Sequence, residues 1–153
     1  KNQPFFVSDA IPQDIGHMLD RLAANDAPGP AALGRRLTAA VESGSLVLTT
    51  DRYWTRCLGF RAMPERVRSV LAAADLVILK GDVNYRRLLD DRHWPHTTPL
   101  EAITGYFPRP FLVLRTLKGE IVVGLEEGQP EALAAEDPDW MINGRRGLVQ
   151  LVT

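Results

Sequence analysis

Charged side chains follow three apolar segments of this sequence, at the points where strands would end. Asp9 closes FFVSD, Lys80 and Asp82 follow LVIL, and Arg115 and Lys118 follow FLVL. Carboxylates are the ligands that hard divalent cations such as magnesium or manganese prefer. Lysine and arginine bind phosphate oxygens. If these groups meet at one edge of a sheet, they could hold a metal ion and a phosphate group.

Alternating strands and helices are expected to position these residues. Six segments are typical of strands, and several are continuous aliphatic runs, the pattern of strands buried on both faces. They are Phe5–Ser8, Leu46–Thr49, Leu76–Leu79, Phe111–Arg115, Ile121–Leu125 and Leu148–Val152. Helical spacing or helix-terminal residues mark five segments between them: Gln13–Ala24, Ala31–Val41, Pro64–Ala74, Val83–Leu89 and Leu100–Gly105.

This order predicts an α/β fold, arranged as a three-layer αβα sandwich around a mainly parallel, Rossmann-like sheet. The short LKGE turn between Arg115 and Ile121 predicts a hairpin, which would make one edge of the sheet antiparallel. Ligands bind beyond the carboxyl ends of the strands in such sheets. We therefore expect the charged residues to converge at that edge.

Composition excludes several classes of function. The chain has 153 residues, 45% of them hydrophobic, and a net charge of −1, which argues against a broad nucleic-acid surface. No apolar run approaches the length of a membrane span. From the net charge we expect no nucleic-acid partner, and from the lack of such a run we expect no membrane partner. Cys57 is the only cysteine, which excludes an intrachain disulfide and favours a reducing, cytoplasmic compartment. Sequence motifs of mononucleotide sites and of the serine-hydrolase elbow are absent.

Each candidate residue also has an ordinary structural explanation. Asp9 and Asp82 stand where the N-cap residue of a helix would stand. Tyr85 could pack in the core, and Arg86 could be a solvated helix position. Lys118 could be an exposed turn lysine. Taken one at a time, these residues do not establish a site.

Read together, the segments FFVSD, LVILKGDVNYRRLLDDRHW and PRPFLVLRTLKGEIVVGL resemble the metal-dependent damage-control phosphatases. The most similar subfamily carries an RTxK motif, here RTLK at residues 115–118, and includes sugar-phosphate phosphatases also described as acidic residue methyltransferase-like proteins. The resemblance extends over nearly the whole chain, including AMPERV and DPDWMINGRRGLVQL. It implies a metal-dependent hydrolase of small phosphomonoesters, such as fructose 1-phosphate or fructose 6-phosphate, in metabolite damage control.

The resemblance also implies roles for particular residues. Asp9 falls on a metal ligand. We expect Asp9 and Asp82 to be the catalytic residues, with Asp82 orienting substrate or handling a proton. The substrate-binding stretch falls on Asp82, Asn84, Tyr85 and Arg86, and a further substrate contact falls on Lys118. The implied cofactor is a divalent metal, which is manganese, magnesium, nickel or cobalt. The implied partner is a small phosphorylated metabolite.

The family's metal site also uses an adjacent Asp-Asn pair on a strand upstream of FVSD, and family members carry a helical N-terminal region. Neither is present in this sequence. We therefore expect residues 1–153 to be the C-terminal part of the α/β phosphatase domain. Its expected partner is the N-terminal portion of the same protein, and by itself the segment is expected to be inactive.

Three structural expectations accompany this interpretation. Arg115 is expected to brace the rim rather than touch substrate, and Lys80 is expected to pair with Asp82. His93 and His96 are expected to be structural or exposed, because their spacing does not match a metal site.

Two other function classes stay open. The first is an S-adenosylmethionine-dependent carboxyl methyltransferase, although no glycine-rich cofactor loop follows a strand here. The second is a non-catalytic binding module.

Overall fold

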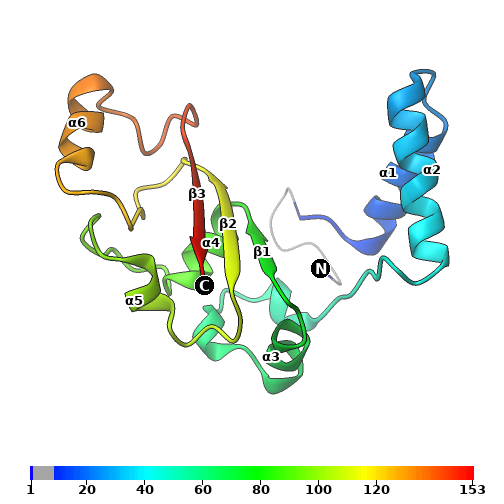
Figure 1. The fold of residues 1–153 in the computed structure, drawn as a ribbon, viewed down its shortest axis with the longest axis horizontal. Coiled ribbons are helices and arrows are strands. Elements are labelled where there is room, and N and C mark those ends of the chain that lie inside the picture. Colours follow the sequence, from blue (N-terminus) through cyan, green and yellow to red (C-terminus); the bar gives the residue numbers. More distant parts are fainter. Residues whose placement is uncertain (2–8) are drawn as a thin grey trace. The chain divides into compact units, whose positions relative to one another are not determined.

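The structure, a computed structural model, describes Lys1 and residues 9–153 (Figure 1). These residues form two compact units, Lys1–Arg56 (unit 1) and Cys57–Thr153 (unit 2). The strand expected at Phe5–Ser8 lies outside the described residues. In the part of the chain that the structure describes, no helix is long and apolar enough to cross a membrane.

Unit 1 contains two helices that pack against each other, α1 (Pro12–Ala23) and α2 (Pro28–Glu42), followed by the short 3-10 helix η1 (Arg52–Thr55). Both α-helices have proline in the first turn, where the missing N–H costs no hydrogen bond. For this reason α2 begins at the first proline of the PGP sequence rather than after it. Gly34 lets the helices approach closely, because a Cβ there would clash with the backbone of Ala23 in α1.

The prediction of a strand at Leu46–Thr49 is wrong. These residues form no strand, and Val47 and Leu48 are exposed. This run lies in unit 1, whose described residues contain helices and no strand with which it could pair.

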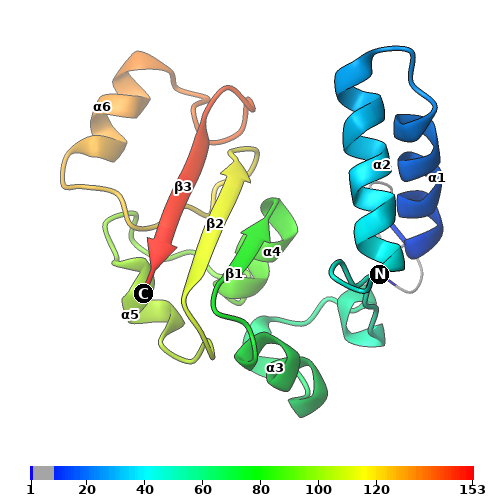
Figure 2. The same ribbon diagram turned by 45° about the vertical axis from the view of Figure 1, so that its right-hand side comes forward.

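Unit 2 is built on a sheet in the order β1-β2-β3 (Figure 2). β1 (Val77–Lys80) runs parallel to β2 (Phe111–Thr116), and β3 (Gly147–Val152) runs antiparallel to β2. The predicted α/β fold and three of its strands are confirmed. An antiparallel edge is also present, but β3 forms it and the segment after the LKGE turn does not.

The helices of unit 2 follow the expected positions closely. They are α3 (Glu65–Ala72), α4 (Asp82–Leu88) and α5 (Leu100–Thr104), with the 3-10 helix η2 (Phe60–Ala62) and the unpredicted α6 (Gln129–Glu136). Alternate strand residues, such as Leu79 and Val113, are buried together with Tyr85 of α4. On the other face of the sheet, Ile78 is 58% and Val149 is 76% exposed. The described residues of unit 2 therefore cover one face of the sheet.

The apolar segment Ile121–Leu125 does not form the expected strand, although Ile121, Val122 and Val123 are buried. Its main-chain groups bond to side chains and to a loop instead of to a neighbouring strand. The side chains of Arg115 and His96 contact the carbonyls of Ile121 and Val122, respectively. At Val123, the N–H donates to the Tyr85 hydroxyl and the carbonyl accepts from the Gln150 side chain. The N–H groups of Gly124 and Leu125 donate to the carbonyls of Thr98 and His96, respectively. These bonds satisfy the buried backbone as a strand ladder would. The predicted hairpin is therefore wrong as well.

Candidate functional site

The parallel strands β1 and β2 end at the same edge of the sheet, and this brings residues far apart in sequence together. Asp82 is the first residue of α4, two residues after the end of β1, and Arg115 is near the end of β2. A cleft of about 370 Å³ opens beside them. Its lining residues are Asp82, Arg86, Asp91, His93, Arg115, Lys118, Gly119, Glu120 and Ile121.

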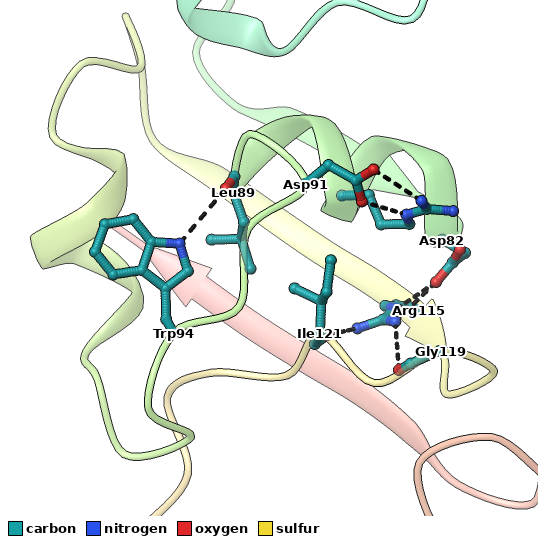
Figure 3. A network of polar contacts seen from close by, with 8 residues as sticks. Asp82, Leu89, Asp91, Trp94, Arg115, Gly119 and Ile121 are labelled. Atoms are coloured by element: carbon teal, nitrogen blue, oxygen red, sulfur yellow. Dashed lines mark hydrogen bonds and ion pairs between the residues drawn. The ribbon is translucent and has the colours of Figure 1, made fainter.

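Arg115 lies at the centre of this edge (Figure 3). Its Nε donates to Asp82 Oδ1 at 2.9 Å, and Nη2 lies 2.8 Å from the same oxygen. Nη2 also donates to the Gly119 carbonyl at 3.0 Å, and Nη1 donates to the Ile121 carbonyl. The side chain is fully buried, and its guanidinium carbon lies 4.5 Å from the centre of the Tyr85 ring. The expectation that Arg115 braces the rim is confirmed.

The pairing expected between Lys80 and Asp82 does not form. Asp82 pairs with Arg115, and Lys80 is exposed at the end of β1. Nor is Asp82 an N-cap, because Gly81 occupies that position of α4 with φ of 98°, a backbone conformation that glycine adopts without strain. Asp82 Oδ1 thus links α4 to β2 through Arg115.

Tyr85 and Asn84 of α4 bond to main-chain groups and do not line the cleft. The Tyr85 hydroxyl accepts a hydrogen bond from the Val123 N–H at 3.1 Å. Burial raises the pKa of Tyr85, although the Val123 N–H and the Arg115 charge oppose that shift. Asn84 Nδ2 donates to the Lys80 carbonyl at 2.8 Å. Neither side chain lines the cleft, so their predicted contact with substrate stays a prediction.

Arg86 lines the cleft and is held by Asp91. Its Nε and Nη2 donate to the two carboxylate oxygens of Asp91 at 2.6 and 2.9 Å. The Arg86 guanidinium lowers the pKa of Asp91, and the Asp91 carboxylate raises the pKa of Arg86. Asp91 has a left-handed backbone (φ 56°), as does Asp90, which is a conformation that aspartate tolerates better than most residues. Sequence reasoning missed Asp91, and the Asp-Asp pair directly after the helix was the signal available.

Lys118 differs from the other cations of the cleft. It is exposed at the end of the β2 segment and lines the cleft. Among the described residues, its ammonium makes no hydrogen bond or ion pair. Arg86 and Arg115 are each neutralised by a carboxylate, so Lys118 is the cation of this cleft with its charge still available to an anion.

The two histidines behave as expected. His96 packs its ring against Trp140, and its Nδ1 lies 2.7 Å from the Val122 carbonyl oxygen. His93 is exposed at the cleft.

A family model described as the damage-control phosphatase ARMT1-like domain matches residues 1–133. The chain belongs to this family. Among curated proteins, damage-control phosphatase ARMT1 of Xenopus laevis is 37% identical over 158 residues, covering all of this chain and 36% of that protein. The proteins of the same name from mouse and human are each 34% identical over 154 residues, covering 98% of this chain and 35% of theirs. The chain thus spans about a third of the length of these relatives.

The predicted metal site of this damage-control phosphatase domain stays a prediction. Asp9 belongs to unit 1, where its Oδ2 lies 2.6 Å from the Lys1 ammonium. Across Lys1 and residues 9–153, no group of three or more histidine, cysteine, aspartate or glutamate residues could hold a metal ion. In the cleft, Asp82 and Asp91 are both committed to arginines. The described residues alone therefore do not fit a divalent cation, which needs several oxygen ligands.

Proposed function

We propose that this chain supplies the phosphate-binding cleft of a metal-dependent phosphatase that hydrolyses small phosphomonoesters. The expected substrates are sugar phosphates such as fructose 1-phosphate and fructose 6-phosphate. One observation carries the proposal, namely the exposed Lys118 at a cleft whose other cations are already paired. Membership of the damage-control phosphatase family, and the names of the curated relatives, support the same chemistry.

In this proposal Lys118 binds the phosphate directly. A lysine ammonium is a compact charge on a flexible stem, and it can follow the phosphoryl oxygens on which charge is concentrated during transfer. Arg86 is the second phosphate contact. Asp91 occupies its Nε and Nη2, which leaves Nη1 to donate to the substrate. Asp91 thereby fixes the direction in which Arg86 points.

The proposed cofactor is a divalent cation (manganese, magnesium, nickel or cobalt), with Asp9 as one ligand and the others from outside this chain. Since the described residues do not form the ligand set, we derive no catalytic step through the metal. This chain contributes two ion pairs, Asp82 with Arg115 and Asp91 with Arg86, in which the charges are balanced. Lys118 adds an unbalanced positive charge to the same cleft.

The test is phosphate release from fructose 1-phosphate and fructose 6-phosphate, with manganese, with magnesium and with EDTA. It should compare this chain with a longer protein that adds the N-terminal portion. In whichever of these two proteins releases phosphate, Lys118→Gln should lower kcat/KM by about a hundredfold. This is the loss typical of removing one group that stabilises the charge of the transition state. Arg145→Gln, which removes an exposed cation distant in sequence from the cleft residues, serves as the matched control and should leave kcat/KM unchanged.

Wild-type turnover by Lys118→Gln would refute the assigned role. Full activity in EDTA would refute the metal dependence. Absence of release from a folded, metal-loaded longer protein would refute the phosphatase proposal itself and leave methyl transfer and non-catalytic binding as the explanations to pursue.

A further inference from the structure

A second cavity adjoins the cleft. It has a volume of about 470 Å³, and we call it the Lys80 cavity. It is lined by Lys80, Gly81, Asp82, Leu114, Arg115, Thr116, Lys118, Gly147, Leu148 and Val149. Asp82, Arg115 and Lys118 line both spaces, so the buried ion pair forms a shared wall and Lys118 can reach either side.

Sheet geometry explains why two lysines meet here. Lys80 is the last residue of β1 and is aligned with Leu114 of β2. Side chains alternate along a strand, so with Leu79 buried in the core, Lys80 lies on the opposite, open face. Lys118 follows the end of β2 by two residues. Because β1 and β2 are parallel, both lysines come to the same edge of the sheet.

The Lys80 cavity carries more positive charge than the cleft. Its charged residues are Lys80, Arg115 and Lys118 against Asp82, a net charge of +2. In the cleft, the three cations Arg86, Arg115 and Lys118 are balanced by the three carboxylates of Asp82, Asp91 and Glu120. In the part of the chain that the structure describes, neither Lys80 nor Lys118 has an ion-pair partner.

Lysine is rare in this chain, and most of its lysines line the Lys80 cavity. The chain has three lysines (Lys1, Lys80 and Lys118) among its 18 basic residues, and the other 15 are arginines. Two of the three line the same cavity. Arginine serves the structural roles, as Arg115 shows, and the flexible point charge of lysine is found where an anion could enter.

We propose that the Lys80 cavity is a second anion subsite. It would take a second anionic group, phosphate or carboxylate, of a ligand whose first phosphate lies in the cleft, with Lys118 between the two groups. The aliphatic walls formed by Leu114, Leu148 and Val149 would contact the carbon skeleton. The preferred ligand class is therefore a small metabolite with two anionic groups, such as a hexose bisphosphate. This inference rests on the proposed function.

The test compares the dissociation constants of fructose 6-phosphate and fructose 1,6-bisphosphate for this chain by calorimetry at fixed ionic strength. The wild type should bind the bisphosphate about fivefold more tightly, as one exposed ion pair allows. Lys80→Gln should remove this preference and leave the affinity for the monophosphate within about twofold. Arg145→Gln, with an exposed cation outside both spaces, is the control and should retain the preference.

Two results would overturn the second subsite alone. One is equal affinity of the wild type for both ligands, and the other is that Lys80→Gln lowers the affinity for both ligands by the same factor. In either case the wild type still binds the monophosphate, so the proposed cleft survives. If neither ligand binds to the wild type, both the subsite and the proposed phosphate cleft are refuted.

Discussion

Arg115 offers the sharpest test of how the candidate site is held together. Its guanidinium is fully buried and bonds to the Asp82 carboxylate and to the carbonyls of Gly119 and Ile121. Arg115→Met keeps most of the side-chain volume and removes every one of these donors. The Asp82 side chain, which is only 15% exposed, would then be a nearly buried carboxylate without a partner.

Removing one partner of a buried ion pair costs about 3–5 kcal/mol, because the other charge stays buried and uncompensated. A domain of this size has a free energy of unfolding of about 5–15 kcal/mol. Arg115→Met should therefore remove a large part of the stability of unit 2. Adding Asp82→Asn to Arg115→Met should restore part of the loss, since a neutral amide is cheaper to bury than a carboxylate.

The assay is urea denaturation followed by far-UV circular dichroism. The matched control is Arg86→Met, the same change at an ion pair whose side chains are 47% and 56% exposed. That control should lose no more than about 1 kcal/mol, because water and salt screen an exposed pair. If Arg115→Met destabilises the chain no more than Arg86→Met does, Arg115 does not brace the edge and the account of the site is wrong.

Two further substitutions test the surroundings of the cleft. Tyr85→Phe leaves the buried Val123 N–H without its acceptor, so the free energy of unfolding should fall by about 1–3 kcal/mol; unaltered stability in urea would contradict this. Asp91→Asn tests the pair with Arg86, which lowers the pKa of Asp91 below its ordinary 3.8. The stabilisation by Asp91 is complete above pH 3.8 and is lost as the pH falls through the lowered pKa. At neutral pH, wild type and Asp91→Asn should differ in free energy of unfolding by less than about 1 kcal/mol, because the pair is exposed. This difference should vanish in strong acid. A difference that persists there in urea titrations would contradict the assignment.

The sequence was sufficient for the parts of the fold that depend on local pattern. The aliphatic runs around Ile78 and Val113 predicted β1 and β2, and proline and glycine located the helix ends within a few residues. The prediction of strands from apolar runs was wrong at residues 46–49 and 121–125. Strand formation depends on a neighbouring edge, and the Ile121–Leu125 backbone finds side chains such as Tyr85 and Gln150 instead, which no local pattern encodes.

For the site, the rule that parallel strands end at one edge brought together Asp82, Arg115 and Lys118, which the structure places around one cleft. The partners within that cleft were harder to predict. Lys80 was expected to neutralise Asp82, but Arg115 does so from β2, 33 residues away along the chain. Asp91 was missed because its role depends on a left-handed turn that directs it back to Arg86. Long-range pairing of charges is set by tertiary geometry, so sequence spacing alone does not determine it.

Binding of the substrate phosphate by Lys118 can be observed directly by NMR, because this chain has only three lysines. Labelling lysine with carbon-13 at Cε gives three signals, from Lys1, Lys80 and Lys118, and Lys118→Gln and Lys80→Gln assign two of them. Fructose 6-phosphate, titrated at constant ionic strength, should shift the Lys118 signal to saturation and leave the Lys1 signal in place. A Lys118 signal that stays still throughout the titration would contradict phosphate binding by Lys118.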